Sequence, residues 1–309
     1  MKKLPRTYTS EHLTSRVRRT LSRYDISVSQ VYSVTTNDDA DILRDFCLRS
    51  DAEDENQASG SVEDAEGGDP ASEADGSPSV LEEQEVAQLP GAVNDSLLAV
   101  RCPAHTLQLA VGDAVRESDS SPIIGRCHAL VYVLRKGGAM EEIRKRGLEI
   151  PVSDYSSNWT STFDMLTGLI KLKDFTADFL SKKGHVGWTD SMWGEVEMLA
   201  KTLQPVQEAM KTLRTEQLTL GDFYGAWLTC LIKTKKIESP LAKALVQSME
   251  NKQRELWDTN IFCAALYMDP RYHFLLSDEH KRRAITHLTN TWERIAGLEQ
   301  NSRIAAALK

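Results

Sequence analysis

The stretch that decides the fold is SLLAVRCPAHTLQLAVGDAV, residues 96–115, because a strand pattern is followed in it by a helix pattern. Its first part, residues 96–102, is a short apolar run of the kind that forms a buried strand. Its second part carries Leu107, Leu109 and Val111 on a helix expected to begin near Pro103, since proline is favoured in the first helical turn. The stretch therefore predicts a strand that leads directly into a helix.

Upstream of this stretch, the pattern mixes helix and strand. Residues 10–23 carry apolar side chains at spacings of four, which predicts an amphipathic helix. Residues 26–36, ISVSQVYSVTT, are rich in β-branched side chains and predict a strand that ends near Thr36. A second helix is expected over residues 42–47.

Downstream, from about residue 120, the pattern is helical throughout. Residues 192–216 place apolar side chains at threes and fours, and Pro205 within them predicts a bend. No strand signal of comparable quality follows residue 102. The pair Asp269–Pro270 is typical of a helix start, with the aspartate as cap and the proline at the first helical position.

These patterns divide the chain into four segments. Residues 1–50 and 91–118 are predicted to form the two parts of a mixed α/β core, and residues 119–309 a helical domain with its following helices. Residues 51–90 are predicted to be a disordered acidic loop, because residues 51–86 hold 13 Asp or Glu and no Lys or Arg. The predicted fold class is α+β and mostly helical.

The net charge of the chain is −8, and it is negative because of the acidic stretch, residues 51–86. Without that stretch, 37 basic residues stand against 32 acidic ones, a balance of +5. The remaining chain is therefore mildly basic, which is compatible with a polyanionic partner such as DNA.

Two further features concern the cellular compartment. The chain has no apolar run of 18 residues, and its start lacks the apolar stretch of a signal peptide, so we expect an intracellular protein without a membrane partner. Its five cysteines are scattered and set in apolar surroundings, which favours reduced thiols over a disulfide framework.

Four sequence blocks occur in a characteristic order: VTTNDDADILRDF (34–46), CPAHTLQLAV (102–111), SSNWTSTFDMLTGLIKLK (156–173) and AALYMDPRYHFLL (264–276). Together they resemble the core of hAT-type transposases and of the host proteins derived from them. The resemblance covers nearly the whole chain apart from the acidic loop. It implies a partial ribonuclease H-like core with a large all-α insertion domain. Relatives commonly bind DNA through an N-terminal BED zinc finger, which this sequence lacks.

The resemblance bears directly on catalysis. In such transposases two aspartates and a glutamate hold the divalent metals that activate water or a sugar hydroxyl. The second aspartate follows a valine and a threonine, and here Thr36 stands in its place. The first aspartate and the glutamate are expected beyond the two ends of this chain.

A neighbouring carboxylate is a poor substitute for the missing aspartate. Asp38 and Asp39 lie two and three residues past Thr36, where the chain is expected to have turned into a helix, so they suit capping better. A hydroxyl is itself a weak ligand for Mg²⁺. We therefore expect no strand-transfer activity and no cofactor, with Mg²⁺ or Mn²⁺ needed only if the chain is an enzyme.

Cys102 and His105 form the next candidate site. A zinc site needs two more ligands, and the adjacent pair Cys127 and His128 is poorly arranged to hold one ion. A nucleophilic cysteine would need an activating base and an orienting carboxylate. The favoured interpretation is that Cys102 ends a buried strand and that His105 caps or packs under the following helix, with zinc as the weaker alternative. The resemblance supports this, since the Cys-x-x-His spacing is a family hallmark that is not a metal site by itself.

Asn158 and Trp159 are the candidate nucleic-acid-binding residues. The matching block of the family carries an Arg-Trp pair, whose tryptophan is thought to stack on a base flipped out of the DNA. Such stacking is worth about 1–3 kcal/mol. Asn158 lacks the charge of the arginine, and the favoured alternative is that Trp159 packs between helices of the insertion domain.

These observations predict a catalytically inactive, hAT transposase-derived fragment in the nucleus that binds DNA or protein partners. An incomplete sheet exposes strand edges, so self-association, for example as a homodimer, is a further expectation. Two alternatives remain open. One is a metal-dependent transposase or nuclease with a truncated gene model, and the other is a protein-interaction module whose acidic loop engages basic partners.

Overall fold

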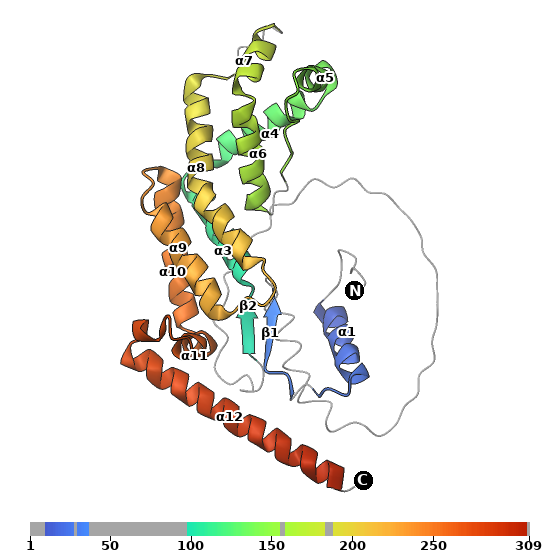
Figure 1. The fold of residues 1–309 in the computed structure, drawn as a ribbon, viewed down its shortest axis with the longest axis vertical. Helices are drawn as coiled ribbons and strands as arrows, with labels where there is room; N and C mark the ends of the chain where they lie inside the picture. Colours follow the sequence, from blue (N-terminus) through green and yellow to red (C-terminus); the bar gives the residue numbers. More distant parts are fainter. Residues whose placement is uncertain (1–9, 28–29, 37–97, 155–157, 183–187, 308–309) are drawn as a thin grey trace, which may run out of the picture. The chain divides into compact units, whose positions relative to one another are not determined.

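The computed structural model describes residues 10–27, 30–36, 98–154, 158–182 and 188–307 (Figure 1). The helix predicted over residues 42–47 and the acidic stretch 51–90 lie outside these ranges. Within the described ranges the protein is mostly helical, as the sequence predicts. It divides into two units, residues 1–100 and residues 101–309.

The described residues of the first unit form helix α1 and two strands, the second of which ends at Arg101. Helix α1 (Ser10–Arg23) confirms the predicted amphipathic helix. Strands β1 (Ser33–Thr36) and β2 (Leu98–Arg101) pair with each other, and their arrows point the same way in Figure 1. Parallel strands need a long connection, and here it is made by residues 37–97.

The strand predicted over residues 26–36 is wrong in its first half. Residues 26, 27 and 30 lie outside any strand, and the backbone N–H of Gln30 donates to the carbonyl oxygen of Ser27 at 3.0 Å. The side-chain amide oxygen of Gln30 in turn accepts the N–H of Ser27 at 2.7 Å. These local bonds compete with strand pairing, so β1 begins only at Ser33.

The second unit is a helical assembly, as predicted from residue 120 onward. Its elements are α3 (Pro103–Glu117), α4 (Ser121–Leu134), α5 (Gly137–Lys145), α6 (Trp159–Lys171), α7 (Lys173–Lys182), α8 (Asp190–Leu213), α9 (Leu220–Thr234), α10 (Pro240–Trp257), α11 (Asn260–Met268), the 3₁₀ helix η2 (His273–Leu275) and α12 (Asp278–Ala307). No helix in the described ranges is long and apolar enough to cross a membrane.

Side-chain caps explain where several of these helices begin. Thr189 and Ser239 accept a backbone N–H of α8 and α10, respectively, and Thr219 forms a reciprocal capping box with Asp222 at the start of α9. Pro205 lies inside α8, which stays continuous but is not straight in Figure 1, in line with the predicted bend.

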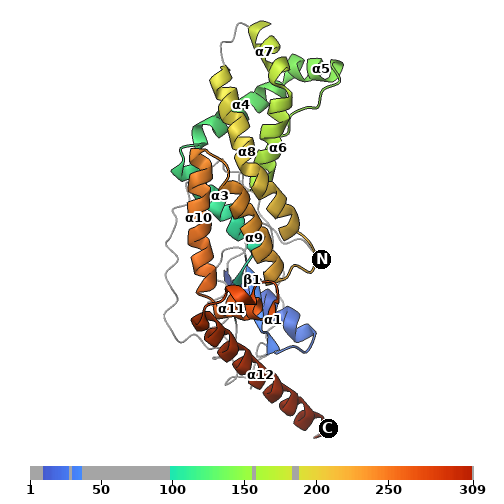
Figure 2. The same ribbon diagram turned by 60° about the vertical axis from the view of Figure 1, so that its left-hand side comes forward.

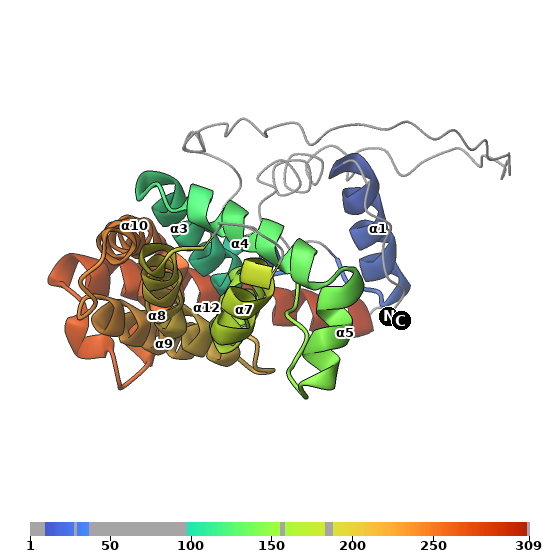
Figure 3. The ribbon, with the colours of Figure 1, turned by 90° about the horizontal axis from the view of Figure 1, so that it is seen from above.

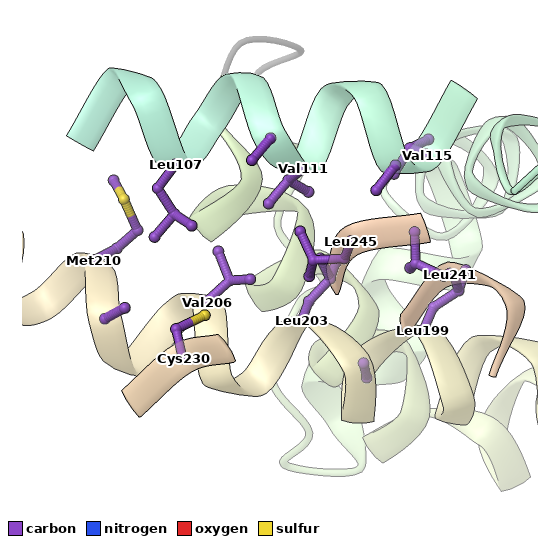
Figure 4. Packing of buried hydrophobic residues seen from close by; sticks show 14 of the residues in the cluster. Leu107, Val111, Val115, Leu199, Leu203, Val206, Met210, Cys230, Leu241 and Leu245 are labelled. Carbon is purple, nitrogen blue, oxygen red and sulfur yellow. The ribbon is translucent and has the colours of Figure 1, made fainter. Parts of the chain in front are cut away.

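The core of the second unit forms where α3 packs along α10 and against α8. Apolar residues of α3 recur every four positions, so one face of the helix is buried. Figure 4 shows Leu107 and Val111 pointing from α3 toward Met210 and Leu203 of α8. Burying each such side chain is worth about 1.5–3 kcal/mol relative to exposure.

The helices between α3 and α10 in the chain extend this core. Figures 1 and 2 both show α10 alongside α3 and α9. Seen from above in Figure 3, α4 runs away from this group and α5 lies at its far end. Helix α6 packs against both α4 and α8. The contact of α3 with α10 thus joins two segments that α4 to α9 separate in the chain.

The predicted helix start at Asp269–Pro270 is wrong. Helix α11 ends at Met268, and a turn leads from there into η2. Asp269 Oδ1 accepts the backbone N–H of Arg271 at 2.9 Å, and the Arg271 guanidinium donates to Asp222 Oδ1 at 2.8 Å. These bonds connect the turn to the start of α9. The backbone of the turn therefore does not continue into an α-helix.

Candidate functional site

The predicted site at Asn158 and Trp159 lies at the first turn of α6. Asn158 has an extended backbone, with φ −135° and ψ 95°, and is the N-cap of this helix. Its Oδ1 accepts the backbone N–H of Thr160 at 3.2 Å and the hydroxyl of Thr160 at 2.6 Å. Asn158 therefore stabilises the start of α6.

Trp159 is half-buried and packs against the core of the helical unit. Its backbone N–H donates to Gln108 Oε1 on α3 at 2.9 Å. A Cβ built on Gly112, one turn further along α3, would lie 4.0 Å from the indole nitrogen. Trp159 thus lies at the contact between α6 and α3.

Sequence reasoning missed the cation of this site, Arg214. Arg214 is the C-cap of α8, and its Nη2 lies 3.3 Å from both Asn158 Oδ1 and Thr160 Oγ1. Within the described ranges, no carboxylate pairs with it. The packing of α6 on α8 therefore places an uncompensated guanidinium beside Asn158. No local signal predicts this, because 56 residues separate the two positions.

Two features strengthen the positive potential at this point. The first turn of a helix carries backbone N–H groups without helical partners and a partial positive charge. Lys211, one turn before Arg214 on α8, is exposed. The first-turn N–H groups of α6 are themselves engaged by Gln108 and Asn158, so the donors left for an anion such as a backbone phosphate are those of Arg214 and Lys211.

Cys102 and His105 lie at the junction of β2 and α3. The helix start at Pro103 is confirmed, and Cys102 is the N-cap that directly follows the strand. Cys102 makes no side-chain cap bond, but its carbonyl oxygen accepts the backbone N–H of Thr106 at 2.9 Å and its hydroxyl at 3.1 Å. Both Cys102 and His105 are half-buried.

Cys127 and His128, the other pair weighed for zinc, differ in burial on α4. Cys127 is fully buried, and burial together with the charge of Asp154 raises its pKa to about 12. His128 is exposed at the surface, with its Nε2 2.6 Å from Asp154 Oδ1. Among the described residues there is no group of three or more His, Cys, Asp or Glu side chains placed to hold a metal.

Thr36 is the last residue of β1, so the strand ends where the sequence predicts. Asp38 and Asp39 lie outside the described residues. Their assignment as helix caps stays a prediction.

Comparison of the sequence with protein-family models and with curated proteins gave no match.

Proposed function

We propose that this chain is a catalytically inactive derivative of a hAT-type transposase that acts in the nucleus as a DNA-binding module. Three observations support the proposal. The four sequence blocks occur in the family's order, Thr36 stands where a metal-binding aspartate would be needed, and strand β2, which pairs with β1, leads directly into α3. A partial ribonuclease H-like core is the arrangement to which such a pair of strands would belong.

The position of Arg214 carries the DNA-binding part of the proposal. Its guanidinium lies within 3.3 Å of Asn158 and Thr160 at the start of α6, next to Trp159. An arginine brought in by tertiary packing would restore the charge that Asn158 lacks. In this arrangement Arg214 holds a DNA phosphate at the positively polarised start of α6, and Trp159 holds the first turn of α6 against α3.

The test is binding of a labelled DNA duplex by the full chain, followed by fluorescence anisotropy over a range of salt concentrations. We expect affinity to fall as salt rises, because each neutralised phosphate releases counterions and contributes a slope of about −0.9 in log K against log salt. Arg214→Gln should weaken binding and make this slope shallower by about one. Arg144→Gln, which removes the same charge from the exposed face of α5, should change neither.

Equal loss in both variants would mean that only net charge matters, which contradicts the proposed site. An absence of DNA affinity in the native chain would instead favour the protein-interaction alternative. Metal-dependent cleavage of the DNA, abolished by joint substitution of Asp38 and Asp39 with alanine, would favour the enzyme alternative.

A further inference from the structure

A pocket of about 580 Å³ opens beside the C-terminal half of α4, well within the size range of small-molecule sites. Helix α4 and the two residues that follow it supply one wall, with His128, Tyr132, Arg135 and Lys136. Ser153, next to Asp154 in the segment before α6, supplies a hydroxyl on the facing wall. Apolar side chains of α4 and α6 complete the lining. The pocket thus combines several polar donors with an apolar surface.

His128 is held in this pocket by a buried carboxylate. Asp154 is only 7% exposed, and its Oδ1 lies 2.6 Å from Nε2 of His128. Its Oδ2 accepts the hydroxyl of Thr162 on α6 at 2.8 Å. Both carboxylate oxygens are therefore occupied, and the imidazole is fixed through one nitrogen at the pocket wall.

Arg135 and Lys136 bring positive charge that nothing nearby neutralises. The Arg135 Nη1 donates to the carbonyl oxygen of Pro151 at 2.8 Å, which leaves further guanidinium N–H donors for a ligand. The Lys136 ammonium lies 3.7 Å from the centre of the Tyr132 ring and donates to the Tyr132 hydroxyl. Neither cation forms an ion pair with any residue that the structure describes.

Several cations elsewhere on the neighbouring surface are neutralised by carboxylates, unlike the two at the pocket. Most cations of the neighbouring helices have carboxylate partners: Arg146 pairs with Asp178, Lys171 with Glu149, and Lys173 with Glu197. The two cations at the pocket mouth differ because the one carboxylate that lines it, Asp154, is already engaged by His128 and Thr162. The pocket therefore keeps a net positive charge at its polar end.

We propose that this pocket binds a small phosphomonoester of nucleotide size, with Arg135, Lys136 and Ser153 as donors to the phosphate group. A phosphate dianion offers three oxygens and matches a fork of arginine donors, an ammonium and a hydroxyl better than a single carboxylate does. The pocket is larger than a phosphate group alone. Its apolar lining and the Tyr132 ring, which is 61% exposed, suit a planar organic group attached to that phosphate.

This site is separate from the proposed DNA contact and does not depend on it. Arg214 lies at the end of α8 and is not part of the pocket lining. The two sites can therefore be inactivated independently.

The experiment is calorimetric titration of the full chain with three probes, AMP, inorganic phosphate and adenosine, at a constant ionic strength of about 0.15 M. We expect saturable binding of one AMP per chain, weaker binding of inorganic phosphate and no binding of adenosine. The double variant Arg135→Gln, Lys136→Gln should lose roughly tenfold or more in affinity for AMP. The matched double variant Arg144→Gln, Lys145→Gln, which removes the same charges from an exposed pair on α5, should bind AMP like the native chain.

A second readout needs no substitution and so does not depend on the folding of a variant. AMP should slow acetylation of Lys136 in the native chain, measured by mass spectrometry of its peptides, and should leave acetylation of Lys145 unchanged.

Four results of these measurements, and a fifth from competition with DNA, would overturn the proposal. The first four are no AMP binding, equal affinity for adenosine and AMP, equal loss of affinity in both double variants, and unchanged acetylation of Lys136 in the presence of AMP. Displacement of AMP by a short DNA duplex at a far lower phosphate concentration would also overturn it, because the site would then belong to the DNA backbone.

Discussion

Nε2 of His128 lies 2.6 Å from Oδ1 of Asp154, and Thr162 donates its hydroxyl to the other oxygen of the same carboxylate. This small network joins α4, the segment before α6 and α6 itself. A buried carboxylate with both oxygens engaged stabilises a fold mainly because losing it leaves its partners unpaired.

We expect Asp154→Ala to lower the free energy of unfolding by about 1–3 kcal/mol, measured by urea unfolding, since it removes both bonds at once. Thr162→Val, which keeps the shape of a side chain that is 2% exposed, should cost about 1 kcal/mol. Asp164→Ala on the exposed face of α6 serves as the control and should stay within about 0.5 kcal/mol of the native chain. A neutral effect of Asp154→Ala would show that the network does not stabilise the fold.

Asn158 allows stability and DNA binding to be separated. Asn158→Asp keeps the capping oxygen and adds a negative charge at the start of α6 beside Arg214, so it should raise the free energy of unfolding by about 0.3–1 kcal/mol. The same charge would repel a DNA phosphate. The variant should therefore melt at a higher temperature and bind DNA more weakly than the native chain. If both quantities rise together, the start of α6 is not a phosphate contact.

Two glycines on helices provide a matched pair for a packing test. A Cβ built on Gly225 of α9 would overlap the hydroxyl oxygen of Tyr272, whose ring packs edge-on against Tyr224 at 5.4 Å. Gly225→Ala should therefore lower the free energy of unfolding by about 1–3 kcal/mol. Gly194→Ala on α8, where nothing lies within 4 Å of the new methyl group, should instead raise it by about 0.5–1 kcal/mol. Calorimetric melting of both variants checks the signs, and a stabilising Gly225→Ala would contradict the packing at Tyr272.

Cys127 and Cys230 should resist alkylation in the folded protein. Burial raises the pKa of both thiols to about 12, with a smaller contribution from Asp154 at Cys127 and from Glu208 at Cys230. At pH 8 such a thiol is about 10⁻⁴ ionised, against about a tenth for a thiol with the ordinary pKa of 9.0. Site-resolved mass spectrometry after iodoacetamide treatment should find half-buried Cys102 modified well before either of them. Equal rates at Cys102 and Cys127 would show that α4 opens faster than the reagent acts.

The same raised pKa values give stability a dependence on alkaline pH. Because the folded-state pKa lies above the ordinary value of 9.0, the unfolded chain ionises first as pH rises. The contribution of the two thiols is fully present below about pH 9 and is lost progressively toward pH 12. Urea unfolding should therefore show a loss between pH 9 and about pH 10.5 that is smaller in Cys127→Ala than in the native chain.

The sequence predicts elements whose signals are local. The helix that begins at Pro103 and the long helix through Pro205 both follow from apolar periodicity and the placement of proline. The errors arise where side chains make competing bonds. The strand predicted from residue 26 is shortened by the hydrogen bonds between Ser27 and Gln30.

The site residues that the sequence did not reveal depend on tertiary packing. Arg214 reaches Asn158 only because α8 lies against α6, and Arg271 reaches Asp222 across 49 residues of chain. Neither contact follows a fixed spacing within one helix or strand. Apolar periodicity and capping patterns in the sequence therefore cannot predict it. Asn158 and Trp159 could be named as candidates because they fall within one sequence block, whereas their cationic partner could not.

The packing of α3 along α10 has a consequence for how the protein is made. A ribosome releases α3 long before α10 has been synthesised, so Leu107 and Val111 face water throughout that interval. The nascent chain then exposes the apolar face of α3, to which chaperones can bind. A messenger that ends translation before Pro240 would yield a product whose α3 never meets its partner, and we expect rapid proteolytic clearance of that product.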